Sequence, residues 1–193
     1  MAIRVIRSSD YRRMRWKNGQ GETAEIAISP AAATVESFAW RISMARIEAD
    51  GPFSAFPGID RTLVVVQGAG LELTVDGQTP VAVVVGGPPF SFRGDSATHA
   101  TLRGGAVTDL NVMTQRNRCW HRVRRLTAAD TIVLGTSAAV AAIACGNGAR
   151  ARVDGATAEL GALDCALAEP GAAALEVLAT GEGGLILVEI GDR

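Results

Sequence analysis

Apolar and polar residues alternate in short runs along the whole chain, and glycine or proline separates most of these runs. A period of two is typical of β-strands that bury one face. In the first half the pattern predicts strands at 22–29, 39–47, 62–67, 70–75, 81–85, 90–93, 97–103 and 107–113. In the second half it predicts strands at 131–134, 138–145, 149–153, 163–168, 174–180 and 185–190. The polar and basic stretch 114–125 is expected to connect the two halves.

The second half is rich in alanine, a composition that would also suit helices. Turn signals recur there every 8–12 residues or so, however, which is too close for long helices. We therefore interpret the apolar segment 138–145 as a strand. Short strands joined by Gly/Pro turns predict an all-β fold, either a barrel or a sandwich.

One β unit is repeated within the chain. The segment QGAGLELTVDG at 67–77 returns as CGNGARARVDG at 145–155, a constant offset of about 78 residues. Each copy has a glycine turn, an alternating strand and an Asp-Gly hairpin. The repeat predicts two similar barrel-like halves, whose functions depend on the polar residues that line each of them.

Composition and charge exclude several classes of function. The chain has 193 residues, of which 48% are hydrophobic and 20% charged, and its net charge is -1. The arginine clusters near 12–15 and 116–125 are offset by acidic residues elsewhere, so we expect no binding to nucleic acid or to acidic membranes. The sequence contains neither an apolar run of about 18 residues nor an apolar core of signal-peptide length. We therefore expect a cytoplasmic protein.

The sequence also lacks the patterns of metal centres and of nucleophilic catalysis. Its two histidines, His99 and His121, do not form HxH, HxxxH or HxxE spacings. There is no GxSxG segment. The three cysteines are odd in number and lack CxxC spacing, so they are expected to be reduced. We expect no metal and no cofactor.

The loop and strand WKNGQGETAEI at 16–26 carry more polar groups than a turn requires. Gly19 and Gly21 permit close approach of another group, and Asn18, Thr23 and Glu25 supply donors and acceptors. The alternative interpretation is a solvated loop that leads into a strand.

A second polar segment, DGPFSAFPGIDR at 50–61, is made rigid by two prolines and two glycines. Phe53 and Phe56 could pin it to a barrel mouth, and Arg61 opens the buried strand that follows. The alternative interpretation is an internal salt bridge that involves Asp60 and Arg61.

Two strands carry polar residues on one face. Arg41 and Ser43 alternate along the first of them, and Asp109 and Asn111 share a face of the second. Interiors filled only for stability normally contain aliphatic residues, so inward-facing polar side chains would line a polar pocket. The alternative is that these faces point to solvent.

The motifs WKNGQGETAEIA (16–27), FAWRISMARIEADGPFSAFPGIDRTL (38–63), FRGD (92–95) and DLNVM (109–113) resemble the HutD/Ves family, named for the histidine-utilisation operon. The resemblance spans about residues 10–116. It implies a bicupin, in which two double-stranded β-helix (jelly-roll) barrels are fused, with a first barrel at 1–116 and a degenerate second one at 117–193. It also implies an association with histidine catabolism.

The chain departs from the family pattern at two positions, where Gln20 replaces a glycine and Ala24 replaces a basic residue. If these positions touch a ligand, this member recognises a slightly different one. In metal-binding cupins, histidines occupy the stretch that here holds Phe53 and Arg61. A cation at this place repels a metal and attracts a carboxylate.

These observations together predict a metal-free protein that binds a small anionic metabolite in its first barrel and has a regulatory role. Expected ligand-binding residues are Asn18, Thr23, Glu25, Trp40, Arg41, Ser43, Phe53, Ser54, Arg61 and Asn111. The resemblance suggests an intermediate of histidine degradation, such as a formylated or formiminated glutamate. The second barrel would be structural or would form a homodimer.

Two other functions remain open at this point. A cofactor-independent enzyme could use Glu25 or Asp109 as a general base, with Arg61 stabilising an anion. A pure interaction module could instead use Phe53 and Phe56 as contact anchors. A deep pocket with convergent polar groups would distinguish the first two functions from the third.

Overall fold

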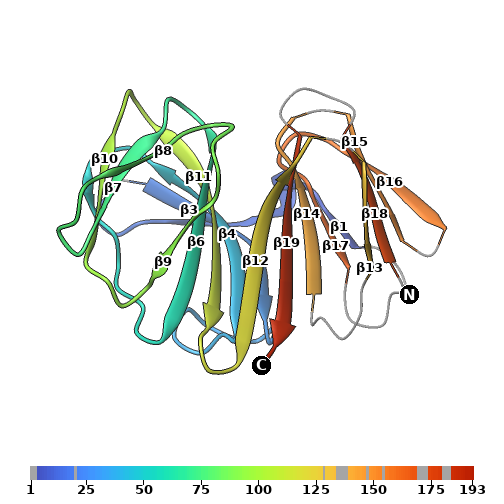
Figure 1. The fold of residues 1–193 in the computed structure, drawn as a ribbon, viewed down its shortest axis with the longest axis horizontal. Coiled ribbons are helices and arrows are strands. Elements are labelled where there is room, and N and C mark those ends of the chain that lie inside the picture. Colours follow the sequence, from blue (N-terminus) through green and yellow to red (C-terminus); the bar gives the residue numbers. More distant parts are fainter. Residues whose placement is uncertain are drawn as a thin grey trace. The chain divides into compact units, whose positions relative to one another are not determined.

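The computed structural model of the chain describes residues 4–19, 21–127, 129–133, 139–146, 148–153, 155–168, 174–179 and 184–193. Apart from a single 3-10 turn, η1 (Ser8–Asp10), the regular structure of these residues is entirely β-strand (Figure 1). The strands are β1 (Arg4–Ile6), β2 (Arg12–Arg15), β3 (Gly21–Ser29), β4 (Trp40–Ile47), β5 (Gly51–Pro52), β6 (Ile59–Gln67), β7 (Leu71–Val75), β8 (Val81–Val83), β9 (Phe90–Arg93), β10 (Thr98–Leu102), β11 (Val107–Gln115), β12 (Cys119–Leu126), β13 (Asp130–Val133), β14 (Ala139–Ala144), β15 (Ala149–Val153), β16 (Ala156–Leu160), β17 (Cys165–Ala168), β18 (Ala174–Ala179) and β19 (Leu185–Asp192).

The predicted all-β class is confirmed, including a strand in the alanine-rich segment at 139–144. Every residue of this strand is buried, so tertiary packing outweighs the intrinsic preference of alanine for helix. Positions 20, 134, 138, 154 and 180, which several of the predictions include, lie outside the described residues.

The chain divides into two compact units. The first unit is Arg12–Arg118, and the second unit is Cys119–Arg193 together with the N-terminal segment that ends at Tyr11. The first unit contains a six-stranded sheet, β2-β3-β4-β11-β6-β9, and a four-stranded sheet, β5-β10-β7-β8. Residues of both sheets form one apolar cluster, so the two sheets pack face to face.

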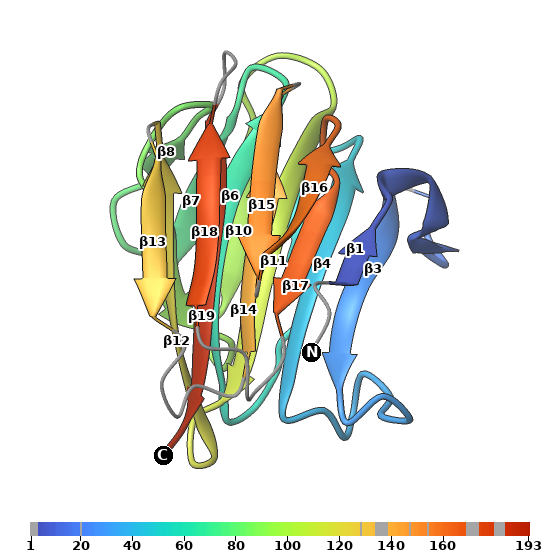
Figure 2. The ribbon, with the colours of Figure 1, turned by 90° about the vertical axis from the view of Figure 1, so that its right-hand side faces the viewer.

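The second unit has the same plan. Its sheets are β1-β17-β14-β19-β12 and β13-β18-β15-β16, and Figure 2 shows the latter four strands side by side. The order β4-β11-β6-β9 in the first unit corresponds to β12-β19-β14-β17 in the second, and β5-β10-β7-β8 corresponds to β13-β18-β15-β16. The internal repeat is therefore also a repeat of strand order, although each unit consists of two separate sheets and not of a closed barrel.

Glycines with left-handed backbone conformation occupy matching places in the two units. Gly70 precedes β7 at φ 100°, and Gly148 precedes β15 at φ 84°. A Cβ atom on Gly70 would lie 2.7 Å from the carbonyl oxygen of Val83, so both the conformation and the close approach require glycine there.

Three features of the second unit differ from the expectations. Cys119–Leu126 is a strand that pairs with β19, and not part of a connection between the halves. Strand β16, which pairs with β15, was not among the predicted strand ranges. The N-terminal segment adds β1 to the edge of the second unit beside β17, whereas residues 1–116 were expected to belong to the first barrel.

The N-terminal segment is held in the second unit by polar contacts to one loop. The carboxylate of Asp164 accepts hydrogen bonds from Arg7 Nη1 (2.7 Å) and from the backbone N–H of Ser8 (2.8 Å). The hydroxyl of Tyr11 donates to the carbonyl of Leu163 (2.6 Å). These partners lie more than 150 residues apart in sequence, so no local pattern of residues indicates their contact.

Candidate functional site

The register of the six-stranded sheet gathers polar side chains on its inner face. The central strand β11 pairs with both β4 and β6: Met113 lies between Arg41 and Arg61, Asn111 between Ser43 and Leu63, and Asp109 between Ala45 and Val65. Residues paired across antiparallel strands point to the same face, so β4, β11 and β6 bring these side chains together. The aliphatic members of the rows join the apolar core of the first unit, and the polar members surround a cavity.

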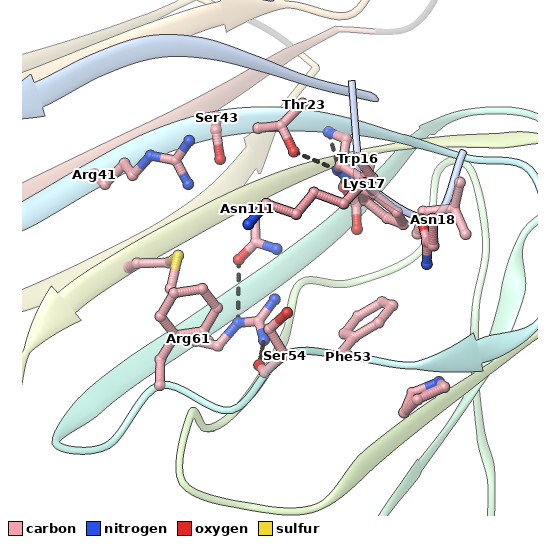
Figure 3. Close-up of a pocket in the computed structure, with 16 residues that line it drawn as sticks. Trp16, Lys17, Asn18, Thr23, Arg41, Ser43, Phe53, Ser54, Arg61 and Asn111 are labelled. Atoms are coloured by element: carbon pink, nitrogen blue, oxygen red, sulfur yellow. Dashed lines mark hydrogen bonds between the residues drawn. The ribbon is translucent and has the colours of Figure 1, made fainter. Parts of the chain in front are cut away.

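This cavity lies within the first unit and has a volume of about 380 Å³. It opens between the sheet, the turn that joins β2 to β3, and the loop at 52–56 (Figure 3). The lining residues are Trp16, Lys17, Asn18, Thr23, Arg41, Ser43, Ala45, Ile47, Pro52, Phe53, Ser54, Phe56, Arg61, Asp109, Asn111 and Met113. The volume is within the range of small-molecule sites.

Arg61 is the buried cation of the cavity, with only 5% of its surface exposed. Its guanidinium carbon lies 5.3, 5.5 and 4.9 Å from the ring centres of Phe53, Phe56 and Phe92. Its polar contacts are long, because Nε donates to Asn111 Oδ1 at 3.4 Å and Nη1 donates to the carbonyl of Ser54 at 3.3 Å (Figure 3). The rings position the cation, while its capacity for strong charged hydrogen bonds remains largely unused.

Asp60 does not pair with Arg61, although an ion pair between these neighbours was an open alternative. Successive residues of a strand point to opposite faces. The Asp60 carboxylate instead accepts from Arg116 Nε (2.6 Å), and Arg116 Nη2 also donates to Asp95 (2.6 Å). Because the Asp60 carboxylate is paired with Arg116 on the other face of the strand, it does not neutralise Arg61, whose side chain faces the cavity.

Arg41, the other arginine that lines the cavity, has a carboxylate partner. Its Nε donates to Glu25 Oε2 at 2.8 Å, and both side chains are largely buried. The pair neutralises much of the charge of Arg41. Glu25 thus lies beside the cavity and holds one of its walls, but it is not among the lining residues.

Asp109 is almost fully buried, at 1% exposure, beside these arginines. Its Oδ1 accepts a hydrogen bond from the backbone N–H of Ala45 at 3.2 Å. Burial raises the pKa of Asp109 to about 7, and the positive charge of Arg61 offsets only part of that rise. Burial also lowers the pKa of Arg61 to about 10, so Arg61 stays charged at neutral pH.

The turn between β2 and β3 forms one rim of the cavity. The indole N–H of Trp16 donates to Thr23 Oγ1 at 2.8 Å and fixes the turn against the sheet (Figure 3). A Cβ atom on Gly21 would lie 2.9 Å from the Trp16 ring, which explains why glycine is needed there. The side chains of Lys17 and Asn18, both exposed, belong to this rim.

Eight of the ten expected ligand-binding residues line the cavity, namely Asn18, Thr23, Arg41, Ser43, Phe53, Ser54, Arg61 and Asn111. Glu25 and Trp40 do not. Trp40 precedes Arg41 on β4 and is buried against the opposite face of the sheet, so the expectation that it supplies an apolar wall is corrected.

Sequence reasoning missed Trp16 and Lys17, although both belong to the motif at 16–27 that the sequence singles out. It also missed Met113, which follows Asp109 and Asn111 with the same period of two. Among the described residues, no group of three or more His, Cys, Asp or Glu side chains could hold a metal ion. Over the same residues, no helix has the length and apolar character needed to cross a membrane.

The fold belongs to a class of all-β proteins with cupin-like structures. A cupin 2 conserved barrel domain protein from Leptotrichia buccalis matches with a TM-score of 0.57 and 7% identity over 94% of this chain and 96% of that one, which shows similarity of fold alone. Within this class the chain belongs to the HutD family, whose sequence model matches residues 8–187.

Individual relatives agree with this assignment. The solved structure of HutD from Pseudomonas fluorescens SBW25 is 34% identical, with a TM-score of 0.85, and the match covers 100% of both chains. An uncharacterized 21.2 kDa protein in the hutC 3′ region of Pseudomonas putida is 41% identical over 111 residues, which are 58% of this chain and 57% of that protein. The matched segment thus spans less than two thirds of that relative's length.

Proposed function

We propose that the protein binds a small carboxylate metabolite in the cavity of the first unit, without a metal. The observation that carries this proposal is Arg61, a buried cation that three aromatic rings position and that forms no ion pair with a carboxylate among the described residues. Charge-assisted hydrogen bonds to a ligand carboxylate would replace its two long contacts. Ser43, Asn111 and Asn18 would supply further hydrogen bonds.

Family membership and the hutC-region relative support a ligand from histidine catabolism and a regulatory role. A formylated glutamate combines carboxylates with a neutral acyl group, which suits a cavity that holds cations, amides and a hydroxyl. The shared strand order of the two units, and the cupin-like neighbour, support the finer proposal that each unit derives from one cupin double-stranded β-helix.

Calorimetric titration with N-formyl-L-glutamate tests the binding function. Wild type is expected to bind, Arg61→Ala to bind about 10- to 100-fold more weakly, and Arg61→Lys to recover only part of the affinity because it loses the bidentate fork. Arg103→Ala, which removes an exposed arginine outside the cavity, is the matched control. Unchanged affinity in a folded Arg61→Ala protein, with melting curves measured in parallel, would refute this role.

A second candidate function is a cofactor-independent reaction of a similar anionic metabolite. The observation that favours it is Asp109, whose raised pKa of about 7 in an enclosed site suits a general base. Arg61 would then stabilise negative charge on the substrate. Conversion of N-formyl- or N-formimino-L-glutamate, followed by NMR and abolished in Asp109→Asn, would establish an enzyme. Binding without conversion would leave the first function.

The convergence of polar groups on one cavity also argues against a pure interaction module. Phe53 and Phe56 were the candidate contact anchors, and both rings instead lie on the guanidinium of Arg61. Their exposure is intermediate, which suits cavity walls better than protruding anchors.

A further inference from the structure

Three basic side chains line the cavity, and only one of them forms an ion pair among the described residues. Arg41 is paired with Glu25 at 2.8 Å. Neither Arg61 nor Lys17 forms an ion pair within the described part of the chain. Two cations are therefore available to a bound anion.

These two cations come from different elements and have different mobility. Arg61 is buried on β6 and held by aromatic rings, so its position is fixed. Lys17 lies on the exposed turn between β2 and β3, and Figure 3 shows its side chain extended from that turn over the cavity. A long ammonium side chain on a rim can adjust its reach to the far end of a ligand.

From this arrangement we infer that Lys17 is a specificity-determining residue that binds a second carboxylate and makes the site selective for dicarboxylates. The inference rests on the proposed binding function and names its ligand class. One carboxylate of the ligand lies on Arg61 inside the cavity, and the other lies on Lys17 at the rim. Two separate cations match two separate anionic groups better than one compact dianion, because a compact group on Arg61 would leave Lys17 unpaired.

Three isosteric ligands test this role. N-formyl-L-glutamate has both carboxylates, while N-formyl-L-glutamine and N-formyl-L-isoglutamine each replace a different carboxylate with an amide. Lys17→Gln should weaken binding of the dicarboxylate and of one amide about five- to tenfold, as expected for a partly exposed charged contact. It should leave binding of the other amide unchanged, because that amide has no charge at the Lys17 end.

Arg15→Gln is the matched control, since it removes an exposed positive charge from β2 outside the cavity. It should leave the affinity of all three ligands within about twofold of wild type at physiological salt. Because Lys17 is exposed, loss of folding will not obscure the result.

The outcomes separate the two proposals. If Lys17→Gln weakens all three ligands equally or none of them, the role of Lys17 is wrong while the binding function stands. If wild type binds none of the three ligands, the proposed function fails, and the inference fails with it.

Discussion

Arg61 combines near-complete burial with incomplete hydrogen bonding, and this combination is energetically costly. A buried charge normally requires a close partner, yet the contacts of Arg61 to Asn111 and Ser54 are 3.3–3.4 Å long. Phe53, Phe56 and Phe92 compensate in part, since each cation–π contact is worth about 0.5–2 kcal/mol. A ligand carboxylate would supply the missing partner, so binding should also stabilise the folded protein.

The buried carboxyl of Asp109 makes the stability of the protein depend on pH. The pKa of Asp109 is raised by burial to about 7, so between about pH 4 and 7 the folded protein holds a proton that the unfolded chain has released. The contribution of Asp109 to the free energy of unfolding therefore falls as pH rises through that window, and it stays low at higher pH. Arg61, which faces the same cavity and has a pKa of about 10, keeps its charge throughout this window.

Asp109→Asn should remove the decrease in stability that Asp109 causes as the pH rises. Relative to wild type, the variant is expected to gain about 2–4 kcal/mol of unfolding free energy at pH 8 and almost nothing below pH 4. Urea unfolding at both pH values measures the difference. An equal effect at the two pH values would show that Asp109 does not hold its proton in the folded state.

At the scale of elements, the turn between β2 and β3 depends on one close contact. A Cβ atom on Gly21 would meet the Trp16 ring at 2.9 Å and would also collide with the carbonyl oxygen of Arg46. Trp16 cannot move freely, because its indole N–H donates to Thr23. The position of the turn, and with it the rim that carries Lys17, is thus fixed by this glycine.

Gly21→Ala should therefore lower stability by about 1–3 kcal/mol and weaken binding of N-formyl-L-glutamate. Gly105→Ala provides the comparison, since Gly105 has φ 69°, open space within 4 Å of the place where a Cβ atom would lie, and no part in the cavity. It should lose about 1 kcal/mol of stability and keep its affinity. Equal affinity for both variants would show that the turn does not shape the site.

Periodicity found the elements that follow a regular pattern and missed those set by distant contacts. Alternation along β4 and β11 placed Arg41 with Ser43, and Asp109 with Asn111, on shared faces, and in the structure these faces line the cavity. It could not place Lys17, because turn residues have no period.

Strand β12 was missed because four of its eight residues, CWHRVRRL, are basic or histidine and hide the apolar alternation. Pairing of β1 with β17 joins residues about 160 positions apart, which no local pattern encodes. The duplicated glycine turns, by contrast, identified matching halves because left-handed backbone conformation demands glycine in both.

At the scale of the whole molecule, the two units have the same strand order and different interiors. The core of the first unit borders a polar cavity, whereas the cluster at the centre of the second unit is made of alanine, leucine and valine. Duplication of a β unit thus accompanies specialisation, in which one copy carries the candidate site and the other is packed with aliphatic side chains.

Asp164→Ala tests whether a change in the second unit affects stability without affecting ligand binding in the first unit. The change removes the acceptor of Arg7, Ser8 and Gly161 in the second unit, and it should cost about 3 kcal/mol of stability. Affinity for N-formyl-L-glutamate should not change in the folded protein, because every lining residue belongs to the first unit. Thermal unfolding and calorimetric titration of the same sample measure both effects, and a parallel loss of affinity would show that the units do not act separately.

A crystal structure of the protein with N-formyl-L-glutamate will show whether a ligand carboxylate binds Arg61. We expect a carboxylate oxygen about 2.7–3.0 Å from the Arg61 guanidinium, inside the cavity that Asn111 and Phe53 line. A ligand bound elsewhere, or bound in this cavity with its carboxylates turned away from Arg61, would contradict it.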